Sequence, residues 1–72
     1  MTIKYKKDPW SEALLIETPS GTAKVYATWS EIKIDGESIL KEYKISVSDA
    51  IAMFFDQAAS QQTRERFKTY LK

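Results

Sequence analysis

The sequence predicts an α+β fold, in which an antiparallel sheet is followed by two C-terminal helices packed on one face. Three observations support this. Residues 22–47 alternate between apolar and polar side chains around an Asp35-Gly36 pair, residues 18–21 have the composition of a turn, and residues 47–71 change to a helical period. The 72 residues form one small domain, because a chain of this length cannot build two cores.

The first nine residues contain an alternating segment in which Ile3 and Tyr5 are interleaved with lysines. This segment forms either an edge strand or a free basic arm, and the pattern leaves both alternatives open. As an edge strand it would make the three-stranded sheet four-stranded, and its lysines would oppose edge-to-edge aggregation. Pro9 favours an extended residue before it and separates the segment from the sheet expected over residues 10–47.

Residues 10–18 form the first strand of the predicted meander, because they contain four consecutive apolar side chains. The turn sequence Thr-Pro-Ser-Gly then leads into the second strand. Because the apolar run is unbroken, the pattern does not decide whether Leu15 or the pair Leu14 and Ile16 faces the core. The set that points outward would lie near Tyr26 as an exposed apolar patch, unless the N-terminal segment or a helix covers it.

The Asp35-Gly36 pair predicts a tight hairpin, because a type I′ turn needs positive φ at both central residues. In this register Ile32 lies opposite Ile39. Apolar positions before residue 30 are odd-numbered whereas Ile32 is even-numbered, so we expect a β-bulge near residues 30–31 to restore the alternation. The buried face would then carry Val25, Ala27, Trp29, Ile32, Ile39, Tyr43, Ile45 and Val47.

Residues 47–71 are predicted to form two helices rather than one. Ser46 is the expected N-cap of the first, with its hydroxyl accepting a hydrogen bond from the amide of Asp49. The apolar stripe of this helix runs to residue 58, but Phe67 and the apolar residues after it lie nearly opposite that stripe at about 100° per residue. We therefore expect a break near Ser60, which can cap the second helix.

The composition argues against several kinds of active site. The chain has no cysteine and no histidine, which removes thiolate zinc sites, a cysteine nucleophile and the usual general base. Both glycines are assigned to turns, so no phosphate-binding loop is available. The carboxylates of Glu31, Asp35 and Glu37 match no calcium loop and are expected in solvent. We expect no enzymatic activity, no metal and no cofactor.

Basic residues gather at the two ends of the chain, around an acidic middle, although the net charge is only +1. A nucleic-acid-binding domain could use them to contact phosphates, whereas cations near a helix C-terminus also have a structural explanation, which we favour. The candidates for nucleic-acid contacts are Lys4, Lys6, Lys7, Arg64, Arg66, Lys68 and Lys72. With no apolar stretch long enough to span a bilayer and no signal peptide, we expect a soluble cytoplasmic protein without membrane contacts.

The function that these observations favour is a non-catalytic protein-binding module, a small regulator or inhibitor. Its small size, the missing catalytic groups and an apolar strand with no polar face all agree with this function. A second copy of the chain is a further candidate partner, since a domain this small is marginal alone. Binding of nucleic acid through the basic ends is the alternative. Candidate residues for contacts with a protein are Trp10, Leu14, Ile16, Tyr26 and Tyr70.

Overall fold

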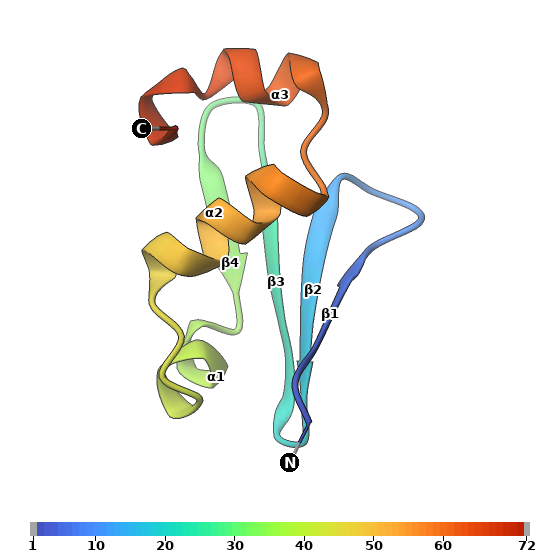
Figure 1. The fold of residues 1–72 in the computed structure, drawn as a ribbon, viewed down its shortest axis with the longest axis vertical. Coiled ribbons are helices and arrows are strands. Elements are labelled where there is room, and N and C mark those ends of the chain that lie inside the picture. The colour runs from blue at the N-terminus through green and yellow to red at the C-terminus, as the bar shows by residue number, and fades with distance from the viewer. Residues whose placement is uncertain (1, 72) are drawn as a thin grey trace.

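The computed structural model describes residues 2–71, which form a four-stranded antiparallel sheet and a set of short helices (Figure 1). In their order across the sheet, the strands are β1 (Lys4–Lys7), β2 (Ala13–Thr18), β3 (Gly21–Ala27) and β4 (Ile32–Asp35). The helical elements are α1 (Glu37–Glu42), α2 (Val47–Gln57), α3 (Gln61–Arg66) and the 3-10 helix η1 (Lys68–Tyr70). The predicted α+β class is confirmed, and the N-terminal segment forms the edge strand rather than a free arm.

The hydrophobic core lies between one face of the sheet and α2, which crosses the strands (Figure 1). Leu14 and Ile16 point into this core and are fully buried, whereas Leu15 points to the opposite face and is half-buried. This settles the orientation of β2 that the sequence left open. The buried apolar cluster consists of Leu14, Ile16, Ala23, Val25, Leu40, Ala50, Phe54, Phe55, Ala58 and Phe67.

The two predicted helix caps are confirmed. The Ser46 hydroxyl accepts a hydrogen bond from the amide of Asp49 over 3.0 Å at the start of α2. The Ser60 hydroxyl accepts a hydrogen bond from the amide of Thr63 over 3.2 Å at the start of α3. The helical segment is therefore interrupted near the residue where the phase of the apolar stripe changes. The break turns Phe67, at the end of α3, back into the core, where it is 5% exposed.

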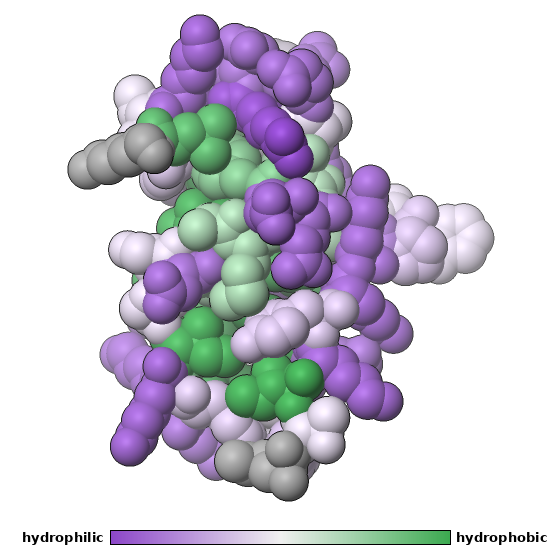
Figure 2. All heavy atoms as spheres, viewed as in Figure 1, coloured by the Kyte–Doolittle hydropathy of each residue, from purple (hydrophilic) through white to green (hydrophobic). Residues whose placement is uncertain are grey.

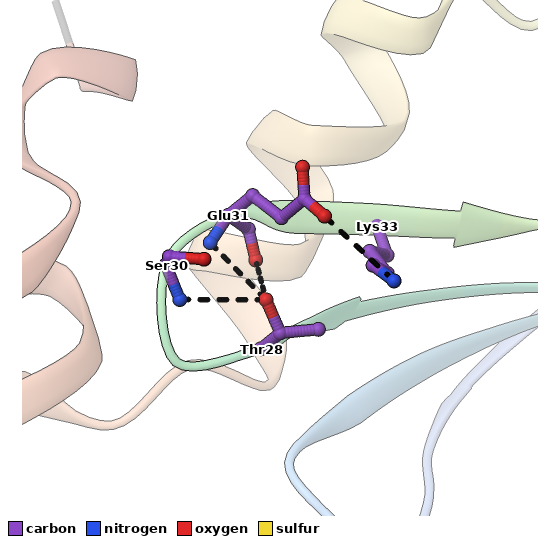
Figure 3. Close-up of polar contacts among 4 residues, drawn as sticks. All are labelled: Thr28, Ser30, Glu31 and Lys33. Atoms are coloured by element: carbon purple, nitrogen blue, oxygen red, sulfur yellow. Dashed lines mark hydrogen bonds and ion pairs between the residues drawn. The ribbon is translucent and has the colours of Figure 1, made fainter.

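The chain turns between β3 and β4 at residues 28–31, a segment predicted to lie within a strand with a β-bulge. The Thr28 hydroxyl donates to the carbonyl oxygen of Glu31 over 3.0 Å and accepts from the Glu31 amide over 3.2 Å (Figure 3). A weaker bond of 3.4 Å joins the amide of Ser30 to the same hydroxyl. Threonine favours such turns because its hydroxyl bonds to the backbone a few residues further on.

The β-bulge predicted near residues 30–31 is therefore wrong. In the observed register Val25 lies opposite Ile34, and Ala27 lies opposite Ile32. Odd-numbered positions of β3 face even-numbered positions of β4, because a turn with an even number of residues separates them. The apolar residues change from odd-numbered to even-numbered positions because of this turn, and not because of an inserted residue.

The hairpin predicted at Asp35-Gly36 is also wrong, because residues 37–42 form helix α1 instead of a strand. Gly36 is the N-cap of that helix, with a φ of 83°, and a Cβ atom there would lie 2.9 Å from the Thr22 carbonyl oxygen. The glycine of the Asp35-Gly36 pair is therefore needed at the start of a helix and not in a hairpin turn. Leu40 is fully buried and the preceding residue, Ile39, is half-buried, so two consecutive apolar residues lie on the core side of α1.

Two residues assigned to the buried face are exposed. Trp29 is 86% exposed because it lies in the turn, and Val47 is 40% exposed because it begins α2 at the margin of the core. The other six members of that face are buried or half-buried: Val25, Ala27, Ile32, Ile39, Tyr43 and Ile45.

Candidate binding surface

Two nearly fully exposed tryptophans lie at the same end of the sheet. Trp10 is 93% exposed and belongs to the connection between β1 and β2, and Trp29 belongs to the turn between β3 and β4. Alternate connections of an antiparallel meander lie at the same end, and α3 lies across this end (Figure 1). We call the surface made by residues 8–12, residues 28–31 and α3 the tryptophan end.

Hydrogen bonds fix the backbone that carries Trp10. The Asp8 carboxylate accepts from the hydroxyl of Ser11 over 2.7 Å and from the amide of Trp10 over 3.0 Å. The hydrogen bond from Ser11, and after it the one from Trp10, holds the pKa of Asp8 below its ordinary value. Lys24 adds an ion pair at 3.9 Å. The loop is therefore held at its base, while the indole projects into solvent.

Arg66 attaches α3 to the turn that carries Trp29. Its guanidinium donates to the carbonyl oxygen of Thr28 over 3.0 Å. It also lies 5.3 Å from the centre of the Trp29 ring and 4.8 Å from that of Phe67, within the range of cation–π attraction. The Arg66 guanidinium thus lies near the Trp29 indole, which still remains 86% exposed.

Glu12 attaches α3 to the other connection. Its carboxylate accepts hydrogen bonds from the amide of Ser60 and, over 2.8 Å, from the hydroxyl of Thr63, the buried residue of α3. Burial raises the pKa of Glu12, but these hydrogen bonds and the nearby charge of Arg66 outweigh it, so the pKa is lowered overall. Helix α3 therefore joins the two tryptophan-bearing connections through one carboxylate and one guanidinium.

A shallow hollow of about 580 Å³ lies beside Trp10. It is lined by residues 7–12 together with Ala58 and Ser60, at the junction of α2 and α3. The tryptophan end therefore has a concave region, the hollow, and a projecting side chain, the Trp10 indole.

The residues predicted to contact a protein do not form one surface. Leu14 and Ile16 are fully buried under α2, so they cannot belong to an exposed surface of this fold. Tyr26 is half-buried on the helix-free face, where the Lys24 amine lies 5.2 Å from its ring centre. Tyr70 is 45% exposed at the end of η1, away from Trp10.

Trp29 was missed as a candidate because the alternation of β3 was extended through it. Two signals in the sequence pointed to a turn: the parity change after it, and the Thr and Ser residues on either side. Trp10, by contrast, was among the candidate residues, and the structure places it in solvent.

The predicted nucleic-acid contacts are distributed over separate elements. Lys4, Lys6 and Lys7 lie along β1, and Lys4 pairs with Glu17 at the end of the sheet opposite to α3. Two of the cations are paired with carboxylates, Lys6 with Glu17 at 3.4 Å and Lys68 with Glu65 at 3.3 Å.

The other predicted nucleic-acid contacts lie in the last part of the chain. Arg64 donates to the carbonyl oxygen of Asp56 over 3.4 Å, near the end of α2, and Arg66 is stacked as described above. Lys72 lies outside the described residues. Within residues 2–71, Lys7 borders the hollow beside the start of α3, but Lys4 lies at the other end of β1, so the basic ends are only partly brought together.

No group of three or more carboxylate side chains within residues 2–71 is placed to hold a metal ion. No helix in this part of the chain is long and apolar enough to cross a membrane. Comparisons of the chain with protein-family models, with curated proteins and with solved structures found no match.

Proposed function

We propose that this chain is a small non-catalytic protein-binding module, a regulator or an inhibitor, whose partner docks on the tryptophan end. The observation that carries the proposal is the exposure of Trp10 and Trp29, at 93% and 86%, at one end of the fold. Tryptophan is strongly enriched among the residues that dominate the binding energy of protein interfaces. Two exposed indoles next to a hollow supply the anchors that such an interface needs.

The supports of the tryptophan end favour tight binding. Asp8 holds the backbone of Trp10, and Thr28 holds the turn of Trp29. Glu12 and Arg66 then fix both connections to α3. A surface that is already ordered loses less conformational entropy when a partner docks on it.

The alternative, nucleic-acid binding through the basic ends, has less support. Among the cations of β1, Lys7 borders the hollow beside the start of α3, whereas Lys4 lies at the opposite end of the sheet. Several of the predicted cations are engaged by carboxylates or aromatic rings. Phosphate contacts that dominate affinity for nucleic acid require cations that are close together and free to reach the backbone.

The test is capture of a binding protein by the immobilised full chain from a lysate of its native cells, compared among variants. We expect Trp10→Ala and Trp29→Ala each to reduce the capture of the same protein by about thirtyfold, the effect of a hot-spot residue. Tyr5→Ala is the matched control, because Tyr5 is an aromatic residue that is 40% exposed on β1, outside the tryptophan end. Circular dichroism checks that all variants are folded.

Gel-shift titrations with single-stranded and double-stranded oligonucleotides at low salt run in parallel. Binding of an oligonucleotide that weakens with salt and with Arg64→Glu would favour the alternative function. Protein capture that persists in both tryptophan variants would contradict the proposal.

A further inference from the structure

The outer edge of β4 has unpaired backbone groups. The Thr28 amide donates to the Glu31 carbonyl oxygen over 2.7 Å, so these two residues form a hydrogen-bonded pair of the β3–β4 ladder. Such pairs alternate along antiparallel strands, so Lys33 and Asp35 direct their backbone groups toward β3, and Ile34 directs its N–H and C=O outward. Within residues 2–71, no backbone group outside the sheet bonds to Ile34. A further strand can therefore bind there.

The other edge of the sheet, β1, is protected against pairing with a second copy. Its sequence is Lys-Tyr-Lys-Lys, and every two-fold antiparallel register of β1 with itself sets a lysine opposite a lysine. Centring on Tyr5, for example, sets Lys4 against Lys6 of the other copy. Like charges directly opposite each other destabilise a strand pair, so β1 disfavours self-association.

β4 has the opposite property, because its sequence Ile-Lys-Ile-Asp is complementary to itself. In a two-fold antiparallel pair centred on Ile34, the two Ile34 residues exchange N–H···O bonds. Lys33 of each copy then lies opposite Asp35 of the other, which gives two pairs of opposite charge on the helix-free face. Both side chains are exposed. The Lys33 amine also lies 3.7 Å from the Glu31 carboxylate, an exposed ion pair of the same copy (Figure 3), so Asp35 of the other copy would share this amine with Glu31.

We propose that the β4 edge binds a second copy of this chain, so that two four-stranded sheets join into one eight-stranded sheet. Opposing residues of an antiparallel pair point to the same face, so the helices of both copies would lie on one side of the joined sheet. This proposal concerns a different surface from the tryptophan end and does not depend on the function proposed above.

Exposed apolar side chains lie on the same flank as this edge. The start of α2 and the turn η1 both extend beyond β4, on the side away from β3 (Figure 1). Val47, at that start of α2, and Tyr70 and Leu71, at the end of η1, are 40%, 45% and 41% exposed.

The space-filling view agrees with this placement. Apolar residues surface around α2 and near the C-terminal end of the described chain, whereas hydrophilic residues cover α3 (Figure 2). A hollow of about 430 Å³ lies beside Tyr70 and Ile51 on this flank. A second copy would cover apolar surface in addition to the strand edge, which would add stability to a domain of this size.

The test is the solution mass of the full chain, measured by sedimentation equilibrium over a concentration series that reaches the millimolar range. We expect a monomer–dimer equilibrium. Lys33→Glu and Asp35→Lys should each raise the dissociation constant of the dimer about tenfold, because the two-fold axis makes each substitution remove two charge pairs. The double variant Lys33→Asp with Asp35→Lys reverses both charges and should restore the wild-type constant.

Lys4→Glu is the matched control, because it makes the same change of charge on the other edge strand and should leave the dimer unaffected. Hydrogen exchange adds an independent readout, since the amide of Ile34 should become more protected as the concentration rises. A chain that stays monomeric at millimolar concentration overturns the proposal. So does a dimer that either single charge reversal on β4 leaves intact, or that the tryptophan substitutions abolish.

Discussion

Helices α2 and α3 are attached to the same sheet by different kinds of interaction. Helix α2 packs through Ala50, Phe54 and Phe55, which are 0–3% exposed. Helix α3 buries a polar residue, Thr63, and only its C-terminal end, at Phe67, reaches the apolar core. It is held in addition by hydrogen bonds from Thr63 to the Glu12 carboxylate and from the Arg66 guanidinium to the Thr28 carbonyl oxygen. Burial of apolar area does not depend on pH, whereas a bond to a carboxylate does. The tryptophan end can therefore loosen under conditions that leave the core intact.

The largest expected effect comes from the apolar attachment. Phe54→Ala leaves a cavity beneath α2 and should cost about 3–5 kcal/mol, which approaches the whole stability expected of a domain this small. Urea unfolding followed by circular dichroism measures this loss, with Asp56→Ala on the exposed side of the same helix as the control. A loss below about 1 kcal/mol would show that α2 contributes far less to the core than its burial implies.

The polar attachment should give a smaller and more local effect. Glu12→Gln keeps the size of the side chain but removes its charge, and should weaken the attachment of α3 by about 1–2 kcal/mol. Amide hydrogen exchange should then be faster in α3 than in the wild type, with α2 unchanged. Glu17→Gln is the control, because Glu17 pairs with Lys6 on the surface, far from α3. Equal acceleration in both helices would contradict a local attachment.

Acid should reproduce the effect of Glu12→Gln in the wild-type chain. The pKa of Glu12 is lower in the folded state than its ordinary value of 4.5, so its stabilising contribution is complete above that value. The contribution is lost as the pH falls through the lowered pKa. We expect the NMR signals of α3 to change before those of α2 in a titration from pH 6 toward about 2, a range that spans carboxylate titration. The same early change in the Glu12→Gln variant would assign it to another group.

The two serine caps offer the smallest and most closely matched comparison. Ser46→Ala and Ser60→Ala each remove one hydroxyl that accepts an amide hydrogen bond, at a cost of about 1 kcal/mol. Ser46→Ala should lower the midpoint of global unfolding, because α2 belongs to the core. Ser60→Ala should mainly speed hydrogen exchange in α3. Identical effects of the two substitutions on the midpoint would mean that α3 unfolds together with the rest.

The helical part of the fold could be predicted because its signals are local. The cap at Ser46, the apolar stripe of α2 and the change of phase near Ser60 all depend on residues within a few turns of one another. The strand from residue 10 to residue 18 and its following turn were also correct in outline, as β2 shows.

The segment after β3 could not be assigned in the same way, because two local signals competed. Asp35-Gly36 suits a hairpin turn, and the same glycine with positive φ also suits the start of a helix. The choice depends on packing, since Gly36 lies against the backbone of β3 and Leu40 enters the core. Neither contact is visible in the alternation of the sequence.

The tryptophan end depends on contacts between residues far apart in the chain. Glu12 binds Ser60 and Thr63, which are 48 and 51 positions away. No periodicity relates these positions, so no pattern could have joined them. Trp10 was a candidate from its residue type alone, and its position at the same end as Trp29 required the correct location of the β3–β4 turn.

The location of both indoles in solvent has a consequence for spectroscopy of this protein. The buried aromatic rings are those of Phe54, Phe55 and Phe67, so no tryptophan reports on the core. We therefore expect the intrinsic tryptophan fluorescence of the native chain to resemble that of indole in water and to change little when the core unfolds. The same property makes this emission a selective reporter of the tryptophan end, since a partner that covers either indole would shift the emission to shorter wavelength.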